Sequence, residues 1–246
     1  MSKHLVAIVA LLLATLGPAT AETDAELAQL RAALLDRFPD AVPEHLAPAP
    51  LPGLYEVVIK GNLLYFTPDG AYALRGTLFD LENRRDLSDP VLAKVRLERL
   101  ATMPESKMII FEPEGVTRHT ITTFTDADCP YCRRMHAEIQ ALLDGGIRVR
   151  YLLYPRTGVD SESYRKAVSV WCASDRNEEL TLAKNGIDPQ PRSCDSPVAE
   201  HVELANELGL TGTPMSVTDT GERIMGYVPA AELIARLDAA APLAQR

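Results

Sequence analysis

The spacing of apolar residues predicts three parts: a short apolar start, a small β-rich part, and a longer part in which strands and helices alternate. Residues 5–16 are apolar or small, and Thr15 is their only polar member. Residues 24–38 repeat an apolar side chain every three or four positions, which predicts a helix that Pro39 ends. The apolar positions of this helix are Leu27, Leu30, Leu34 and Phe38.

Short apolar runs follow a proline-rich joint at residues 43–52 and predict a small antiparallel sheet. The predicted strands are residues 54–59, 63–66, 71–74 and 77–81. Gly61-Asn62 and Asp69-Gly70 are typical of hairpin turns, and Gly76 marks a break. A domain of this size, residues 22–87, is only marginally stable alone. We therefore expect it to be a dimerisation domain that pairs with a second copy of itself.

Residues 88–104 are predicted to form one helix between the small sheet and the rest of the chain. Ser88 is a capping residue, Pro90 falls in the first turn and Pro104 stops the helix. We interpret this segment as a linker helix that joins two domains. An amphipathic helix packed on only one of them has the same pattern.

Residues 105–246 alternate strands with helices in the order of a thioredoxin-like catalytic domain. The predicted strands are 108–111, 120–124 and 147–153, followed by a hairpin of 215–218 and 223–227. The predicted helices are 132–143, 162–173, 197–208 and 230–240. Asp160 or Ser161 is expected to cap the second helix, and Ser196 the third. With its helical insertion, this domain and the small β domain give a predicted α+β fold class.

The start of the chain has the features of a cleavable signal peptide, residues 1–21. Lys3 and His4 precede the apolar run, Gly17-Pro18 breaks it, and Ala19-Thr20-Ala21 fits a cleavage site. The run is shorter than the ~20 residues that cross a bilayer. An uncleaved anchor or a buried helix is the alternative interpretation. We expect the mature chain to contain no membrane span.

Composition excludes some functions. The formal net charge of −9 becomes −10 once Lys3 is removed with the signal peptide. This acidic chain lacks the basic patch that nucleic acid requires, so no nucleic-acid partner is expected. Its content of 46% hydrophobic residues is ample for a core.

The central chemical motif is Cys129-Pro130-Tyr131-Cys132, which lies between a predicted strand and a predicted helix. The first thiol is expected at the helix N-terminus, where free N–H groups and the helix dipole favour the thiolate. The second thiol is close enough to form a disulfide with it. Such a pair exchanges electrons with protein disulfides through a mixed disulfide.

A second motif, Gly212-Thr213-Pro214, directly precedes the predicted strand 215–218. In thioredoxin-like proteins a cis proline at this point lies beside the reactive cysteine. The cis bond would leave the backbone of Thr213 free to pair with an extended substrate. An ordinary trans proline in a turn is the alternative.

Metal and haem sites are weaker interpretations of the cysteines, and no cofactor is expected. Cys129, Cys132 and His136 form a partial zinc set without a fourth ligand. A c-type haem would need His directly after Cys132, where Arg133 stands. The even count of four cysteines in an exported chain suggests two disulfides.

The run from Phe124 to His136, FTDADCPYCRRMH, resembles the active-site segment of the DsbC/DsbG family of thiol:disulfide interchange proteins. Thr213-Pro214 matches the same family, and the Pro130-Tyr131 pair is closer to DsbG. The resemblance covers the whole mature chain. It implies a periplasmic isomerase or reductase that forms a homodimer and that a membrane reductant of the DsbD type keeps reduced. It also implies a structural disulfide between Cys172 and Cys194, for which a second redox pair is the alternative.

The expected function is interchange on misoxidised exported proteins, with Cys129 attacking and Cys132 resolving the mixed disulfide. The ring of Tyr131 is expected to border the thiol on the client side. Arg133, Arg134 and His136 are interpreted as a solvated helix face, although His136 could add positive potential. The alternatives are a DsbG-like reductant of sulfenylated single cysteines and a chaperone-like protein that binds clients without using its thiols. A monomeric oxidant would leave residues 22–87 unexplained.

Overall fold

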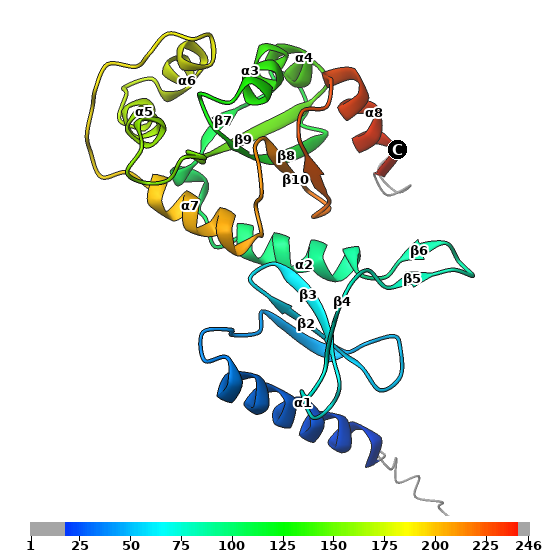
Figure 1. Cartoon of the computed structure of the whole chain (residues 1–246). Coiled ribbons are helices and arrows are strands. Elements are labelled where there is room, and N and C mark those ends of the chain that lie inside the picture. Colours follow the sequence, from blue (N-terminus) through cyan, green and yellow to red (C-terminus); the bar gives the residue numbers. More distant parts are fainter. Residues whose placement is uncertain (1–17, 241–246) are drawn as a thin grey trace, which may run out of the picture.

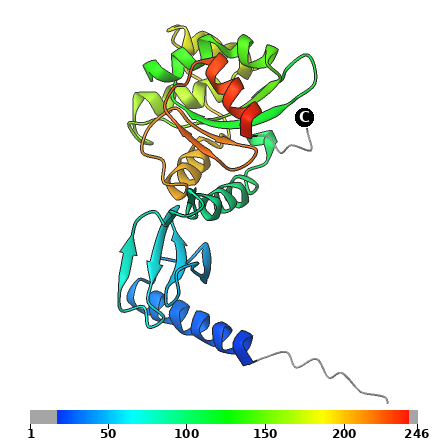
Figure 2. The ribbon, with the colours of Figure 1, turned by 90° about the vertical axis from the view of Figure 1, so that its right-hand side faces the viewer.

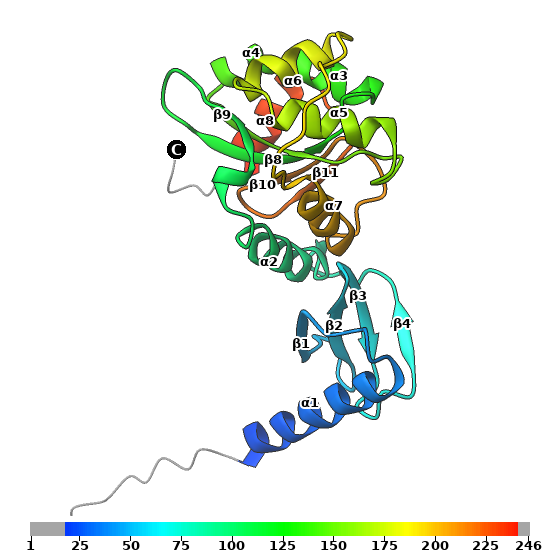
Figure 3. The same ribbon diagram turned by 90° about the vertical axis from the view of Figure 1, so that its left-hand side faces the viewer.

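The computed structural model describes residues 18–240 and arranges them as two units on either side of helix α2 (Asp89–Leu100) (Figure 1). Figure 2 and Figure 3 show the same units from two sides, with the smaller sheet on one side of α2 and the larger sheet on the other. The predicted α+β class is confirmed. Of the predicted signal peptide, residues 1–17 lie outside the described residues, and the rest begins helix α1 (Pro18–Arg37). Within residues 18–240, no helix combines the length and apolar character that a membrane crossing needs.

The small unit is a four-stranded antiparallel sheet with α1 on one face. Its strands in spatial order are β1 (His45–Pro48), β2 (Tyr55–Ile59), β3 (Asn62–Phe66) and β4 (Ala73–Arg75). Leu30 of α1 packs with Val57, whereas the next residue, Val58, packs with Val95 of α2. Because alternate residues of a strand point to opposite faces, β2 is buried from both sides.

Three details of this unit differ from the sequence prediction. Strand β1 lies inside the segment expected to be a joint, and it is an edge strand that Pro48 ends, a position that proline tolerates. The predicted strand 77–81 does not join the sheet, since β5 (Phe79–Asp80) pairs only with β6 (Arg85–Asp86). The β2–β3 turn is Lys60-Gly61, one residue earlier than expected.

Helix α2 packs against both units. Val95 lies in a cluster with Tyr65 of the small sheet. Leu100 lies in a cluster with Phe124 and Leu208 of the larger unit. The helix ends at Leu100, three residues before the predicted end.

Polar contacts also join the two units. Arg96 is 5% exposed and donates to the carbonyl oxygen of Gly221, and Arg99 forms an ion pair with Glu207. Gly61 lies so close to the end of α7 that an added Cβ would stand 2.5 Å from the Glu207 carbonyl oxygen. A side chain at position 61 would therefore push the small sheet away from the larger unit.

Ser88 lies at the N-cap of α2, but its hydroxyl does not cap the helix. It accepts a hydrogen bond from the Leu78 N–H (2.7 Å) and bonds the Tyr65 hydroxyl (2.8 Å). Asp86 instead accepts from the N–H groups of Ser88 (2.7 Å) and Asp89 (3.1 Å). The predicted cap was therefore wrong, because the hydroxyl joins α2 to the preceding strands.

The larger unit is a five-stranded sheet in the order β11-β10-β8-β9-β7, in which only β8 and β9 are parallel. Its strands are β7 (Ile109–Phe111), β8 (His119–Thr125), β9 (Ile147–Leu153), β10 (Met215–Thr218) and β11 (Arg223–Met225). Its helices are η1 (Glu105–Lys107), α3 (Pro130–Ala137), α4 (Ile139–Asp144), α5 (Glu162–Trp171), α6 (Arg176–Lys184), α7 (Val198–Glu207) and α8 (Ala230–Ala240). Figure 1 shows α3, α4 and α8 on one face and α7 on the other, beside α2.

The two faces of the larger sheet carry separate cores. Strand β8 directs Ile121 toward Met135 and Leu142 of the α3–α4 side. It directs Phe124 toward Leu204 of α7. The strands and most helices agree with the sequence prediction. Helix 132–143 is divided at Glu138, and α6 was not predicted.

His201 of α7 is fully buried and bonded as a neutral ring. Its Nδ1 accepts from the Leu153 N–H (3.1 Å), and its Nε2 donates to the Lys107 carbonyl oxygen (2.7 Å). A proton added at Nδ1 would face an N–H group. Burial accordingly lowers the pKa of His201 to about 4.

This arrangement predicts acid sensitivity. The unfolded chain protonates His201 near pH 6.5 and the folded chain only near pH 4, so stability is complete above 6.5 and falls between these values. The expected loss from this residue is about 3 kcal/mol at the acid end. Denaturant unfolding at pH 7 and pH 4 should show a smaller decrease for His201→Asn than for the wild type. Equal decreases would contradict the assignment.

Candidate active site

The two motif cysteines lie where β8 leads into α3. Cys129 is the N-cap residue of α3 with an extended backbone, and Pro130 is the first helical residue. Cys132 lies in the first turn. Both are free thiols, each 1% exposed. The local sequence explains the geometry, since proline is tolerated only where a helix N–H needs no partner within the helix.

The Gly212-Thr213-Pro214 segment lies against these thiols. The Thr213–Pro214 peptide bond is cis. The next strand, β10, pairs with β8, and the Cys129 thiol donates a hydrogen bond to the Thr213 carbonyl oxygen (3.3 Å). The Thr213 hydroxyl is buried next to this bond, and it has no hydrogen-bond partner of its own within residues 18–240. Cys129 and Thr213, 84 residues apart in the sequence, thus belong to one site.

The two thiols differ in acidity. Burial tends to raise the pKa of Cys129, but the hydroxyl of Thr213 and the N–H groups of Cys132 and Tyr131 outweigh it, so this pKa falls below its usual value. Burial dominates at Cys132 and raises its pKa. The first thiol is therefore the better nucleophile at neutral pH.

Charged and polar groups near Cys132 limit the increase of its pKa. The positive charge of Lys184 lowers the pKa of Cys132, followed by the Asp126 N–H and the Thr125 hydroxyl. Lys184 is the last residue of α6 and is 3% exposed.

Asp126 anchors the turn between β8 and Cys129. Its buried carboxylate accepts hydrogen bonds from the Arg156 N–H (3.0 Å) and side chain (3.1 Å), the Ser163 hydroxyl (2.8 Å) and the Asp128 N–H (2.9 Å). Burial opposes ionisation, yet these donors together lower the pKa of Asp126. The carboxylate thus fixes the backbone that presents Cys129.

His136 corrects the prediction of a solvated helix face. It is 2% exposed, and its ring bonds the hydroxyls of Tyr151 (3.3 Å) and Thr181 (3.0 Å). Burial, together with the charge of Lys184, lowers its pKa to about 4. His136 is therefore neutral at pH 7 and adds no positive potential, so that expectation was wrong.

The other residues around the motif face outward. Tyr131 is 57% exposed, and the Arg134 guanidinium lies 5.7 Å from the centre of its ring. Arg133 donates to the Ala127 carbonyl oxygen (2.8 Å). The exposed Tyr131 ring gives an incoming chain an apolar surface next to Cys129.

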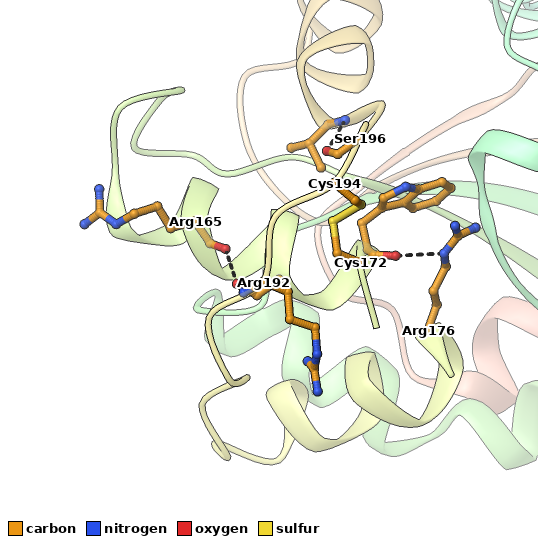
Figure 4. Close-up of a disulfide and its surroundings, with 9 residues drawn as sticks. Arg165, Cys172, Arg176, Arg192, Cys194 and Ser196 are labelled. Carbon is orange, nitrogen blue, oxygen red and sulfur yellow. Dashed lines mark hydrogen bonds between the residues drawn. A yellow bond between two sulfur atoms is a disulfide. The ribbon is translucent and has the colours of Figure 1, made fainter. Parts of the chain in front are cut away.

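Cys172 and Cys194 form a disulfide apart from the redox motif (Figure 4). It joins the end of α5 to the segment before α7 and closes a loop that contains α6. Arg176 lies beside it, with its guanidinium 3.7 Å from the Trp171 ring centre. The Arg192 N–H donates to the Ser169 hydroxyl (3.2 Å).

No metal-binding cluster forms in the described part of the chain: no three His, Cys, Asp or Glu side chains converge there. His136, the third member of the partial zinc set, instead bonds two hydroxyls.

Sequence reasoning missed Lys184, Thr125 and Asp126 as site residues. Thr125 and Asp126 were visible only as part of the family segment. Lys184 was missed because α6 was missed. A signal for α6 existed in Asp175, which caps the helix by accepting from the Glu178 N–H (2.9 Å).

A pair of free thiols at a helix N-terminus, facing a cis proline loop on this sheet, defines a thiol-disulfide oxidoreductase of the thioredoxin fold. Residues 105–241 match the thioredoxin-like domain family, and residues 19–89 match the disulfide bond isomerase protein N-terminal domain. The chain belongs to the DsbC family of thiol:disulfide interchange proteins.

The chain is similar in sequence to curated relatives and to a solved structure. The chain is 35% identical to the thiol:disulfide interchange protein DsbC of Dickeya dadantii, over 78% of this chain and 79% of that protein. It is 34% identical to the protein of the same name from Escherichia coli, over 78% and 80%. A disulfide interchange protein structure from Neisseria gonorrhoeae is 30% identical, with a TM-score of 0.49, over 55% of this chain and 97% of that one.

Proposed function

We propose that this chain isomerises and reduces disulfides in misoxidised exported proteins, with Cys129 as the attacking and Cys132 as the resolving thiol. The observation that carries the proposal is a pair of free thiols at the start of α3, the first of which donates to the Thr213 carbonyl oxygen beside the cis Thr213–Pro214 bond. Pro130 and Tyr131 support the site by starting the helix and by bordering the first thiol.

In the first step the Cys129 thiolate attacks one sulfur of a client disulfide. A Cys129–client disulfide forms, the client disulfide breaks, and the second client sulfur leaves as a thiolate. Hydrogen bonds from the helix N–H groups and from Thr213 stabilise the attacking anion. We expect the client sulfur to approach along the Tyr131 and Thr213 side of the site, where the Tyr131 ring is exposed.

The second step decides the outcome. When the freed client thiolate attacks another client disulfide, and the original link is later displaced by a client sulfur, the client is isomerised and the enzyme pair stays reduced. When Cys132 attacks Cys129, the client leaves as a dithiol and the enzyme pair is oxidised. The raised pKa of Cys132 slows this resolution and leaves time for isomerisation.

We propose three domains, residues 22–87, 88–104 and 105–246. The first of these, the small unit, is proposed to form a homodimer with a second copy of the chain. Strand β4 is an edge of its sheet, which leaves backbone groups open to a second copy. Apolar side chains before, on and after this strand are exposed: Tyr72 (75%), Leu74 (58%), Phe79 (49%) and Leu81 (83%).

This proposal predicts that Leu74→Asp weakens the dimer. A charge placed on the apolar edge costs free energy only when a partner covers that edge. Sedimentation of the purified mature protein should show a dimer for the wild type and a shift toward monomer for Leu74→Asp. Val116→Asp is the matched control, because Val116 is 82% exposed in the larger unit. A monomeric wild type, or a Leu74→Asp protein that remains as dimeric as the control, would contradict the proposal.

Export to the periplasm through residues 1–21 is proposed with this function, because disulfides persist in that compartment. Each reduction leaves Cys129 and Cys132 oxidised, so a dithiol donor must restore them. A membrane reductant of the DsbD type is the proposed donor.

A second candidate uses the same thiols: reduction of single cysteines oxidised to sulfenic acid. The Pro130-Tyr131 pair, which is closer to DsbG, favours it. Here Cys129 would condense with the sulfenic acid and release water, and Cys132 would then resolve the mixed disulfide.

Reactivation of a scrambled multi-disulfide protein at a mildly oxidising thiol poise tests the proposal. The wild type should restore client activity, whereas Cys129→Ala should not. Reduction of insulin without reactivation would instead assign a dedicated reductase.

A further inference from the structure

Lys184 is a buried cation that the mechanism so far does not use. Its Nζ donates to the Thr125 hydroxyl oxygen (2.5 Å) and to the Asp126 carbonyl oxygen (2.8 Å). Only 3% of the residue is exposed. A buried ammonium group is costly unless an anion compensates it, so its position calls for a partner.

No carboxylate among the described residues contacts the ammonium directly, although the charge of Asp126 favours it from a distance. Among residues 18–240, no Asp or Glu side chain forms an ion pair with Lys184. The carboxylate of Asp126 belongs to the same residue as the carbonyl oxygen that Lys184 contacts. This carboxylate accepts hydrogen bonds from Arg156 and Ser163 instead. Lys184 bonds only the backbone of Asp126.

The group that can become an anion next to this cation is Cys132. The Thr125 hydroxyl accepts from Lys184, and it is also placed to donate its own hydrogen to the Cys132 thiolate. One hydroxyl therefore bridges the ammonium and the sulfur. Helix α6 brings Lys184 to the site, and the Cys172–Cys194 loop encloses this helix.

We infer that Lys184 is a positioning residue that acts as the counter-ion of the Cys132 thiolate through the Thr125 hydroxyl, and that it thereby promotes release of the client. The inference rests on the interchange function proposed above and deepens it. It assigns to α6 a part in the choice between isomerisation and reduction.

In the resolving step Cys132 loses its proton to solvent, and the Lys184 ammonium stabilises the resulting thiolate through the Thr125 hydroxyl. The thiolate attacks Cys129 Sγ, the Cys129–Cys132 bond forms and the Cys129–client bond breaks. The client sulfur leaves with the electron pair and takes up one proton. The enzyme pair is oxidised and the client is reduced.

The acidity of Lys184 fits this role. Burial is the largest influence and lowers its pKa to about 8, and the Cys132 thiolate is the strongest group opposing that shift. An amine with this pKa is mostly protonated at neutral pH, so Lys184 carries the positive charge that a counter-ion of the Cys132 thiolate needs. The titratable or charged groups that face it are Cys129, Cys132, Arg133 and His136 of α3 and Asp126 after β8.

A purely structural role for Lys184 makes a different prediction. If the role is only structural, replacing Lys184 lowers the stability of the protein but leaves the pH midpoint of Cys132 ionisation unchanged. The test must therefore measure the acidity of Cys132 itself, in a protein that needs no client.

The experiment titrates Cys132 in the Cys129→Ser background by the ultraviolet absorbance of its thiolate. Lys184→Met and Thr125→Val are each expected to raise the midpoint by about one pH unit. Lys107→Met is the matched control, because Lys107 is half-exposed and pairs with Glu200 away from the site. In proteins that retain Cys129, client release from the mixed disulfide should slow about tenfold, while attack by Cys129 keeps its rate.

An unchanged Cys132 midpoint in the folded variants would overturn the inference, even with interchange intact. Thr125→Val decides the question if Lys184→Met does not fold. A wild type that forms no mixed disulfide would instead contradict the proposed function, and the titration would still test the pairing of Lys184 with Cys132.

Discussion

A Cys132→Ser protein is expected to accumulate as mixed disulfides with its clients, whereas Cys129→Ser forms none and loses interchange completely. Cys129 is the N-cap residue of α3 and the thiol with the lowered pKa, so we expect it to make the first bond. Cys132 lies in the first turn of α3 and is the proposed resolving thiol. Without it, a client can leave only by attack of its own thiols or of another thiol in solution.

Non-reducing electrophoresis after acid quenching measures the trapped species. The wild type should show little of it, Cys132→Ser the most, and the Cys129→Ser/Cys132→Ser double variant none. Equal trapping by Cys129→Ser would reverse the proposed roles of the two thiols.

Removing the Cys172–Cys194 disulfide is the second change with a large expected effect. The bond closes a loop with a sequence separation of 22 residues. In the chain-entropy model, the Cys172→Ala/Cys194→Ala variant loses about 3 kcal/mol of unfolding free energy. Denaturant unfolding under conditions that keep Cys129 and Cys132 reduced in both proteins measures this loss.

The folded double variant should still form mixed disulfides through Cys129. Loss of interchange chemistry in a folded variant would show that Cys172 and Cys194 act as a second redox pair. An unchanged unfolding free energy would contradict their structural role.

Much of the fold could be predicted because its strongest signals are local. Strand β9 and helix α8 have the predicted bounds, since alternating or helical apolar spacing is uninterrupted there. The CPYC motif and Thr213-Pro214 also carry their own signal. The family resemblance predicted that these two segments, far apart in the sequence, lie side by side in the fold.

What the sequence could not predict depends on contacts between distant residues. The hydroxyl of Ser88 looks like a helix cap until Leu78 and Tyr65 compete for it. His136 looks solvated on a polar helix until α6 covers it. Lys184 belongs to the site only because the fold returns its helix to the end of β8.

Alkylation of the reduced protein as a function of pH tests most directly the central claim that Cys129 attacks and Cys132 resolves. Mass spectrometry identifies the modified residue at each pH. The account predicts that Cys129 reacts first, with a midpoint below that of an ordinary cysteine thiol, while Cys132 reacts only at higher pH. Modification of Cys132 before Cys129, or a Cys129 midpoint at or above the ordinary value, would contradict it.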